Sequence, residues 1–318
     1  MQNKRLSHIT HDGKTMILKQ VPEDFIVQEI NHLNLVPQGN YSCFKLKKKE
    51  WGTMEALFAL GKALNIDIRR LGIAGMKDKR GVTEQYASAY QVSKEQLETI
   101  HIKNMEITFI GYLQERITLG QLQGNHFKIV VRDIQEQKDI PADKKILNLF
   151  DYQRFGKDEQ NIPLGKALLQ GNYTLLCEHF KLTVKDNNYI GALRTVNRRI
   201  LRFILCAYQS HLWNTIVQRL TQIYTTVPVL GYLTDYTGEI KEAYEKLLQE
   251  EGVTQEDFKM KKIPELASEG NERKMYTTVT NLTYHWEKDQ HHGNYKCTLE
   301  FDLEKGQYAT HVVKTLFS

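Results

Sequence analysis

The two ends of this chain alternate apolar and polar residues in the manner of half-buried β-strands, whereas its middle does not. Residues 15–47 follow the alternating pattern, and Phe25–Ile30 is a clear example of it. The pattern returns after Thr277 and is most regular in Tyr295–Phe301. Strand-like ends around a middle of another kind predict one sheet domain into which a second segment is inserted.

The middle of the chain is predicted to be mainly helical. Ile190–Leu220 has the periodicity of one long amphipathic helix, with Ile200 and Phe203 on its apolar stripe. Glu242–Glu251 predicts a second, more polar helix that ends at a glycine.

The sheet domain is also expected to contain a helix, over residues 53–64 with Thr53 as its cap. The fold class that follows is α+β, with a mainly antiparallel mixed sheet and helices. We place the sheet domain at residues 1–153 and 279–318, and the inserted domain at residues 154–278.

The composition excludes several classes of protein. Hydrophobic residues make up 41% of the 318 residues and charged residues 25%, which is typical of a globular protein. We find neither an apolar run as long as a membrane span nor an N-terminal signal peptide. The four cysteines are scattered without a C-x-x-C pair, which indicates reduced thiols. We therefore expect a cytoplasmic protein.

Charge is distributed unevenly along the chain. Residues 45–80 contain ten Lys or Arg and four Asp or Glu, whereas residues 232–272 contain five Lys and eleven Asp or Glu. The first region attracts phosphate and the second repels it. This polarity predicts a nucleic-acid-binding face in the N-terminal half, with the acidic stretch turned away.

Asp78 lies among cations in a glycine-punctuated segment, G-M-K-D-K-R-G, between two strand-like runs. Gly75 and Gly81 allow a sharp turn and the close approach of a ligand. An acid displayed there and kept ionised by its neighbours suits a nucleophile or a general base that acts on a polyanion. A solvated turn with a local ion pair is the alternative interpretation.

Four further segments combine aromatic, amide and basic side chains. They are Lys19–Glu29, Gly124–Phe127, Asn148–Gly156 and Phe301–Thr310. Aromatic faces stack on bases, amides read base edges, and Lys and Arg bind phosphate. Each aromatic taken alone is expected in the core, but together with Asp78 the segments favour contact with RNA bases.

With these residues the chain resembles the TruD family of pseudouridine synthases, which isomerise uridine in RNA. The resemblance extends over nearly the whole length, through six motifs in order. These are P-E-D-F-x-V-x-E at Pro22–Glu29, A-G-x-K-D-x-x-x-x-T-x-Q at Ala74–Gln85, G-N-x-F at Gly124–Phe127, Q-R-F-G at Gln153–Gly156, Q-S-x-L-W-N at Gln209–Asn214 and G-x-Y-A-T at Gly306–Thr310. One departure is Glu50, at a position where the family often has Asn.

The resemblance implies roles for individual residues. Asp78 matches the family's catalytic aspartate, and Lys19 matches a basic residue near that site. The residues that match its uracil pocket are Phe25, Asn125, Phe127 and Phe301. Contacts with the RNA backbone are expected at Lys77, Lys79, Arg80 and Arg154.

The resemblance also implies the fold and the substrate. Residues 1–153 and 279–318 would form the catalytic pseudouridine synthase domain, and residues 154–278 the inserted α/β (TRUD) domain. Bacterial members modify the uridine at position 13, in the D arm of tRNA, so tRNA is the expected partner. The reaction exchanges a C–N for a C–C glycosidic bond without redox change, so neither a metal nor another cofactor is expected. A monomer is expected, because no heptad seam or long apolar edge is evident.

Several alternatives remain open. The sequence does not decide whether Asp78 attacks the uracil ring or the sugar, or acts as a base on the ribose. Within the family, another RNA is an alternative substrate, and a non-catalytic RNA-binding protein of the same fold is an alternative function. A base deaminase would need a His/Cys zinc site with a neighbouring Glu, which the sequence lacks. An incidental charged loop on a structural module would not explain six ordered motifs.

Overall fold

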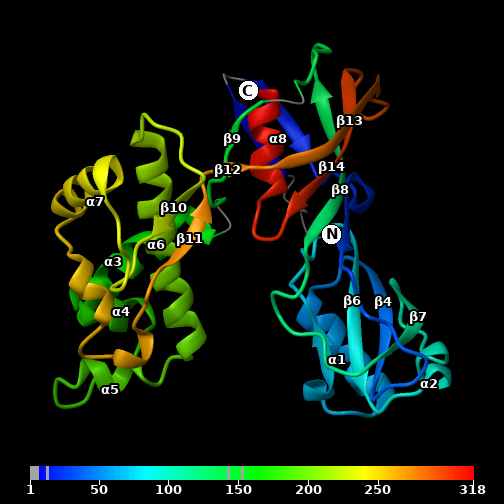
Figure 1. The fold of residues 1–318 in the computed structure, drawn as a ribbon, viewed down its shortest axis with the longest axis horizontal. Coiled ribbons are helices and arrows are strands. Elements are labelled where there is room, and N and C mark those ends of the chain that lie inside the picture. Colours follow the sequence, from blue (N-terminus) through cyan, green and yellow to red (C-terminus); the bar gives the residue numbers. More distant parts are fainter. Residues whose placement is uncertain (1–6, 12–13, 142–143, 152–153) are drawn as a thin grey trace. The chain divides into compact units, whose positions relative to one another are not determined.

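The chain forms two compact units in the computed structural model, which describes residues 7–11, 14–141, 144–151 and 154–318 (Figure 1). Unit 1 comprises Met1–Lys144 and Thr278–Ser318, and unit 2 comprises Lys145–Thr277. We propose that unit 2 is the inserted domain, which then begins a few residues before the expected position 154. Gln153, the first residue of the Q-R-F-G motif, lies outside the described residues.

Unit 1 is built on a sheet in which ten strands of the described chain take part. Its strands are β1 (Ser7–His11), β2 (Lys14–Leu18), β3 (Phe25–Ile30), β4 (Tyr41–Lys49), β5 (Leu71–Ile73), β6 (Val82–Tyr90), β7 (Met105–Leu113), β8 (Gly124–Ile134), β13 (Val279–Lys288) and β14 (Tyr295–Glu304). Their order along the main path is β1-β2-β8-β3-β6-β4-β7, with β5 paired to β6, β14 to β8, and β13 to β14. The β3–β6 pair is parallel and the other pairs are antiparallel. The predicted α+β class with a mainly antiparallel sheet is therefore confirmed.

The helices of unit 1 are α1 (Thr53–Leu64), α2 (Lys94–Glu98) and α8 (Ala309–Phe317), and short 3-10 turns cover Pro22–Asp24 and Ile68–Arg70. The apolar face of α1 packs on β4, β5 and β6 in a core cluster that includes Phe44, Leu60 and Ile73. At the end of α8, the Phe317 ring meets Trp286 of β13 edge to face. Helices thus pack against the sheet and leave the loops between its strands available for a site.

The N-terminus of α1 differs in one respect from the expectation. Gly52 is the cap residue, and its amide donates to the Glu55 carboxylate at 2.9 Å. Thr53 was predicted to cap the helix, but it is the first helical residue, and its hydroxyl bonds to the loop that carries Asp78. The Thr53 side chain, which the local pattern assigned to the helix cap, therefore makes a tertiary contact instead.

Unit 2 contains helices and two short antiparallel strand pairs. Its helices are α3 (Asn161–Gln170), α4 (Tyr173–His179), α5 (Tyr189–Leu193), α6 (Arg198–Arg219) and α7 (Gly238–Glu251). Its strands are β9 (Ile146–Leu147), β10 (Thr226–Val229), β11 (Asn271–Lys274) and β12 (Tyr276–Thr277), which pair as β10–β11 and β9–β12. Short 3-10 turns cover Lys157–Glu159, Gln255–Lys259 and Pro264–Leu266. A separate core, centred on the buried rings of Tyr208, Trp213 and Tyr244, holds these elements together.

The predicted helix over Ile190–Leu220 is wrong in two ways. The chain breaks between α5 and α6, because the Asn197 side chain accepts a hydrogen bond from the Arg199 amide and caps a new helix. Ile200 and Phe203, assigned to the buried stripe, are 46% and 41% exposed. The helix that ends at Gly252 was correctly predicted, since α7 ends there in a left-handed cap with φ 63°.

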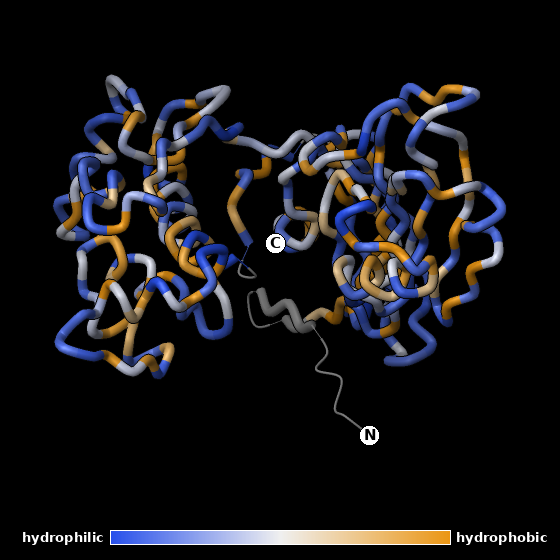
Figure 2. Tube along the Cα trace, turned by 90° about the horizontal axis from the view of Figure 1, so that it is seen from below, coloured by the Kyte–Doolittle hydropathy of each residue, from blue (hydrophilic) through white to orange (hydrophobic). Residues whose placement is uncertain are grey.

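Hydrophobic and hydrophilic residues are interleaved along the tube in both units (Figure 2). This pattern is expected of helices and strands that each bury one face. Among the described residues, none of the helices has the length and apolarity needed to cross a bilayer.

Candidate active site

Asp78 lies on the loop between β5 and β6, and buried polar side chains hold the backbone of that loop. The Thr53 hydroxyl accepts a hydrogen bond from the Lys77 amide at 2.9 Å and lies 3.2 Å from the Lys77 carbonyl oxygen. The Gln85 amide donates to the Gly75 carbonyl at 3.1 Å. Thr53 and Gln85 are each only 1% exposed, so water does not compete for these bonds. The loop is therefore preorganised on both sides of Asp78.

Gly81 closes the same loop against β3. Its φ is +141°, a value that side chains rarely adopt, and an added Cβ would lie 2.4 Å from the Phe25 carbonyl oxygen. The glycine therefore allows the loop to lie close to the start of β3, which carries an aromatic residue of the site.

The Asp78 carboxylate pairs with Lys19, which is 59 positions away in the sequence. The Lys19 Nζ atom lies 2.7 Å from Asp78 Oδ2 and 3.7 Å from the centre of the Phe25 ring. The Lys19 side chain is 7% exposed, whereas the Asp78 side chain is 39% exposed. A buried cation thus holds a carboxylate that remains accessible to a ligand.

The phenyl rings of Phe25, Phe127 and Phe301 form a contiguous cluster on adjacent strands. Phe127 of β8 lies between them: its ring centre is 6.2 Å from that of Phe25 and 5.6 Å from that of Phe301. Phe127 is directly opposite Phe301 in the β8–β14 register. Strand alternation places all three on the buried face of the sheet, and Phe301 is completely buried. The four residues Lys19, Phe25, Phe127 and Phe301 are therefore brought together with Asp78.

Asn125 lies on β8 two residues before Phe127, on the same face of the sheet, between Glu29 of β3 and Leu303 of β14. Its amide oxygen is buried and has no hydrogen-bond partner among the described residues. The Thr83 hydroxyl and the Gln307 amide oxygen are in the same condition. Buried polar atoms are nearly always paired, so unpaired acceptors near a candidate site suggest that a ligand supplies the donor.

Sequence reasoning missed Gln307 and Thr83 as candidate site residues. Gln307 occupies the variable position of the G-x-Y-A-T motif, and Thr83 belongs to the Asp78 motif without an assigned role. The motifs include both residues, but what distinguishes these two side chains from their neighbours is a buried oxygen atom without a partner among the described residues, which the sequence does not reveal.

The cations next to Asp78 in the sequence do not pair with it as expected. The Lys77 Nζ atom lies 2.8 Å from Glu29 in a buried ion pair, and Lys79 pairs with Glu55 at the surface. The burial of Lys77 also argues against its predicted contact with RNA. Arg80 is exposed, as is Lys79, and Arg154 belongs to unit 2.

A second buried ion-pair network supports the turn that precedes Phe25. The Arg132 guanidinium of β8 donates to Asp24 at 2.7 and 2.9 Å and to Asp289 at 3.0 Å. Burial alone would raise the pKa of Asp289, but the amides of His291 and Asp133, together with Arg132, hold that pKa below its usual value. The network links the Pro22–Asp24 turn to β8 and so positions Phe25.

Lys48 supports the backbone of Asp78 itself. Its Nζ atom donates to the Trp51 carbonyl at 2.7 Å and to the Asp78 carbonyl at 3.2 Å, and the residue is 1% exposed. Burial lowers the pKa of Lys48 from 10.5 to about 8, although the charge of Asp78 opposes the shift.

We predict that this lysine makes the stability of the protein depend on pH. Between about pH 8 and 10.5 the unfolded chain binds the Lys48 proton and the folded chain releases it, so the contribution of Lys48 to the free energy of unfolding rises with pH. The free energy of unfolding of wild type minus that of Lys48→Met should therefore rise by up to about 1.4 kcal/mol per pH unit over this range. Urea unfolding from pH 7 to 10.5 measures it, with Lys47→Met, an exposed neighbour on β4, as the control. Equal pH profiles for Lys48→Met and wild type would refute the assignment.

The described residues contain no group of three or more His, Cys, Asp or Glu side chains arranged to hold a metal ion. All four cysteines are free thiols. Burial raises the pKa of both Cys43 and Cys297 to about 12, so these two thiols stay protonated.

The chain is similar to proteins of one family over most of its length. The model of the family described as tRNA pseudouridine synthase D (TruD) matches residues 3–180 and 218–316. The protein named "Probable tRNA pseudouridine synthase D" of Methanosarcina mazei is 26% identical, over 93% of this chain and 92% of its own length. The tRNA pseudouridine synthase D of Aquifex aeolicus is 32% identical, over 59% of this chain and 52% of its own length.

A solved structure has the same fold. The crystal structure of the Methanosarcina mazei protein assigned as tRNA pseudouridine synthase D superposes with a TM-score of 0.76 at 25% identity. The superposition covers 95% of this chain and 93% of that chain.

Proposed function

The chain belongs to the TruD family of tRNA pseudouridine synthases, which are isomerases, and from this premise we propose that it modifies the uridine at position 13, in the D arm of tRNA. The observation that carries the proposal is the arrangement around Asp78. A carboxylate on a braced loop pairs with the buried Lys19 and lies beside a cluster of phenyl rings.

The reaction breaks the N1–C1′ bond of uridine and forms a C5–C1′ bond. The proton that leaves C5 is balanced by one that binds to N1, so the product is an isomer of the substrate. Inside a helical stem the uridine is stacked, and we propose that it is flipped out toward Asp78. Phe25 and Phe127 would contact the flipped base, and Phe301, which is fully buried, would support Phe127 from behind.

Asp78 must be ionised whether it acts as a nucleophile or as a base. We propose that Lys19 holds the carboxylate in one orientation, because the ammonium is 2.7 Å away and shielded from water. The Phe25 ring beneath the ammonium fixes the position of Lys19 through a cation–π contact.

We propose that Asn125 reads the uracil. Its buried amide oxygen has no hydrogen-bond partner among the described residues and would accept a hydrogen bond from the N3–H group of the base. Lys79 and Arg80, which are exposed beside Asp78, would contact the RNA backbone.

The direct test is to incubate the protein with unmodified tRNA transcripts and map pseudouridine by mass spectrometry. We expect pseudouridine at position 13 and none in a matched transcript that carries cytidine there. Modification only at another uridine would refute the D-arm assignment. Tight binding of tRNA without any pseudouridine would instead identify a non-catalytic RNA-binding protein of this fold.

A further inference from the structure

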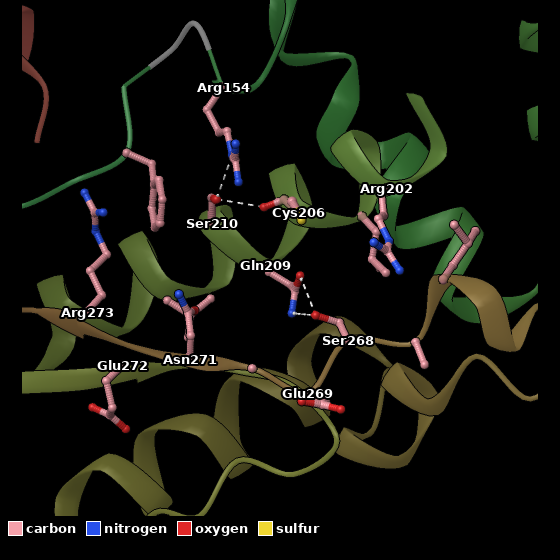
Figure 3. Close-up of a pocket in the computed structure, with 16 residues that line it drawn as sticks. Arg154, Arg202, Cys206, Gln209, Ser210, Ser268, Glu269, Asn271, Glu272 and Arg273 are labelled. Carbon is pink, nitrogen blue, oxygen red and sulfur yellow. Dashed lines mark hydrogen bonds between the residues drawn. The ribbon is translucent and has the colours of Figure 1, made fainter. Parts of the chain in front are cut away.

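Unit 2 contains a cavity of about 620 Å³ that no residue of the Asp78 site lines (Figure 3). The residues that line it are Phe150, Arg154, Arg202, Leu205, Cys206, Gln209, Ser210, Val229, Leu266, Ala267, Ser268, Glu269, Gly270, Asn271, Glu272 and Arg273. We call this cavity the unit 2 pocket. Its volume falls within the range of about 300–1,000 Å³ that is usual for ligand sites.

Four parts of unit 2 form the pocket. Helix α6 contributes five residues between Arg202 and Ser210, the segment Leu266–Arg273 lies opposite, and Val229 of β10 completes the wall with Phe150 and Arg154. The contribution of α6 falls between the two ranges that the family model matches.

Two of its guanidinium groups have no carboxylate partner among the described residues. Arg154 donates from Nε to the Ser210 hydroxyl at 3.3 Å, and Arg202 donates to the Glu265 carbonyl oxygen at 3.2 Å. Both bonds orient the side chains without neutralising their charge. Arg154 and Arg202 therefore keep their positive charge at the pocket wall, which suits a phosphate.

Two acidic residues, Glu269 and Glu272, also line the pocket beside the three arginines, so the net charge of its lining stays positive. Successive residues of a strand point to opposite sides, so Glu272 points away from the side that carries Asn271 and Arg273. Figure 3 shows the Glu272 carboxylate directed away from the arginines. Glu269 is exposed.

Phe150, Arg154 and Arg273 of the pocket wall belong to a series in which aromatic rings and guanidinium groups alternate; the buried Trp213 and the exposed Phe203 end this series outside the lining of the pocket. The Arg154 Cζ atom lies 5.5 Å from the centre of the Phe203 ring and 5.7 Å from that of Phe150. The Arg273 Cζ atom lies 3.9 Å from the Phe150 centre and 5.2 Å from that of Trp213. Phe203, at one end of the series, is 41% exposed. Such surfaces accept unstacked bases, because bases stack on both aromatic rings and guanidinium planes.

The side-chain amide of Gln209 stabilises the wall formed by α6, because both of its N–H groups donate to other segments of unit 2. It donates to the Leu230 carbonyl at 2.6 Å and to the Ser268 hydroxyl at 2.9 Å, and Gln209 is 4% exposed. These bonds join α6 to the segment before β11 and hold the pocket open without a ligand.

We propose that the unit 2 pocket binds an unpaired nucleotide of the tRNA other than the uridine that is modified. The phosphate lies against Arg154 and Arg202, and the base stacks on Phe203 at the end of the aromatic series. This inference rests on the proposed function, because it takes tRNA as the ligand. The pocket thereby contributes affinity and substrate choice, while Asp78 performs the chemistry.

The test compares Arg154→Gln/Arg202→Gln with a control that removes two surface charges elsewhere in unit 2, Arg219→Gln/Lys241→Gln. The Kd for an unmodified tRNA transcript should rise roughly tenfold or more in the pocket variant, and its salt dependence should fall by about two counterions. The control should change the Kd less than twofold.

Phe203→Ala tests the stacking surface, with Ile200→Ala, also exposed on α6, as its control. We expect the Kd to rise roughly fivefold or more for the phenylalanine variant alone. Equal Kd values for the pocket variants and their controls would overturn the proposal. If the wild type binds tRNA but forms no pseudouridine, the proposed function fails, and the same Kd comparison still decides the pocket.

Discussion

Replacing Asp78 with asparagine abolishes pseudouridine formation, with a loss of at least about a thousandfold in single-turnover rate. Asparagine has the size and shape of aspartate and still accepts a hydrogen bond from Lys19, so the loop keeps its structure. It cannot act as a general base, and it is a poor nucleophile, because the negative charge is gone. The measurement is pseudouridine yield by mass spectrometry with protein in excess over tRNA.

The control for this variant is Asp67→Asn. Asp67 also forms an ion pair, with Arg69 at 2.7 Å, but lies at the surface of unit 1. Its substitution should leave the rate unchanged within twofold. The Kd of Asp78→Asn for tRNA should match that of wild type within twofold. Its melting temperature should match that of wild type within about 2 °C. An active Asp78→Asn protein would remove the carboxylate from the mechanism.

Arg132→Met is expected to lower the free energy of unfolding by about 3–5 kcal/mol. Arg132 pairs with both Asp24 and Asp289, whose side chains are 2% and 0% exposed. Methionine fills a similar space but leaves two carboxylates buried without a cation. Because this network holds the turn before Phe25, we also expect the rate of pseudouridine formation to fall.

Lys128→Met is the matched control, since Lys128 lies on the same strand and its partner Glu300 is exposed. Surface pairs contribute little, so this variant should lose less than about 1 kcal/mol. Urea unfolding at pH 7, followed by tryptophan fluorescence, measures both variants. Equal losses would show that the Arg132 network is no more important than a surface pair.

The segments that form the candidate site could be recognised from sequence, and so could Lys19 as a cation near Asp78, but the partner of Lys77 could not. The motif around Asp78 identified the carboxylate, and Phe25, Phe127 and Phe301 were identified by their motifs and do meet in space. Lys77 seemed the natural neighbour of Asp78 but is paired with Glu29. Adjacent residues in an irregular loop point in different directions, and a counter-ion is selected by tertiary distance.

Two predictions from local sequence pattern were wrong: one because a side chain makes a tertiary contact, the other because a side chain is exposed. The hydroxyl of Thr53 holds the Asp78 loop instead of capping α1. The apolar stripe that includes Phe203 suggested burial, but that ring is exposed beside Arg154. Glu50 adopts φ 60°, a left-handed conformation that asparagine tolerates better than glutamate does, which agrees with the asparagine that the resemblance leads one to expect there.

The amino-acid sequence alone determined the α+β class, the strand-rich ends around a mainly helical middle and the loop that displays Asp78. These features depend on periodicity and on short motifs, which act over a few neighbouring residues. Only the tertiary structure decided that Lys77 pairs with Glu29, that Asn125, Thr83 and Gln307 have buried acceptors, and that unit 2 contains a cationic pocket. Each of these depends on side chains from distant segments, and their approach follows from packing of the whole unit rather than from any local pattern.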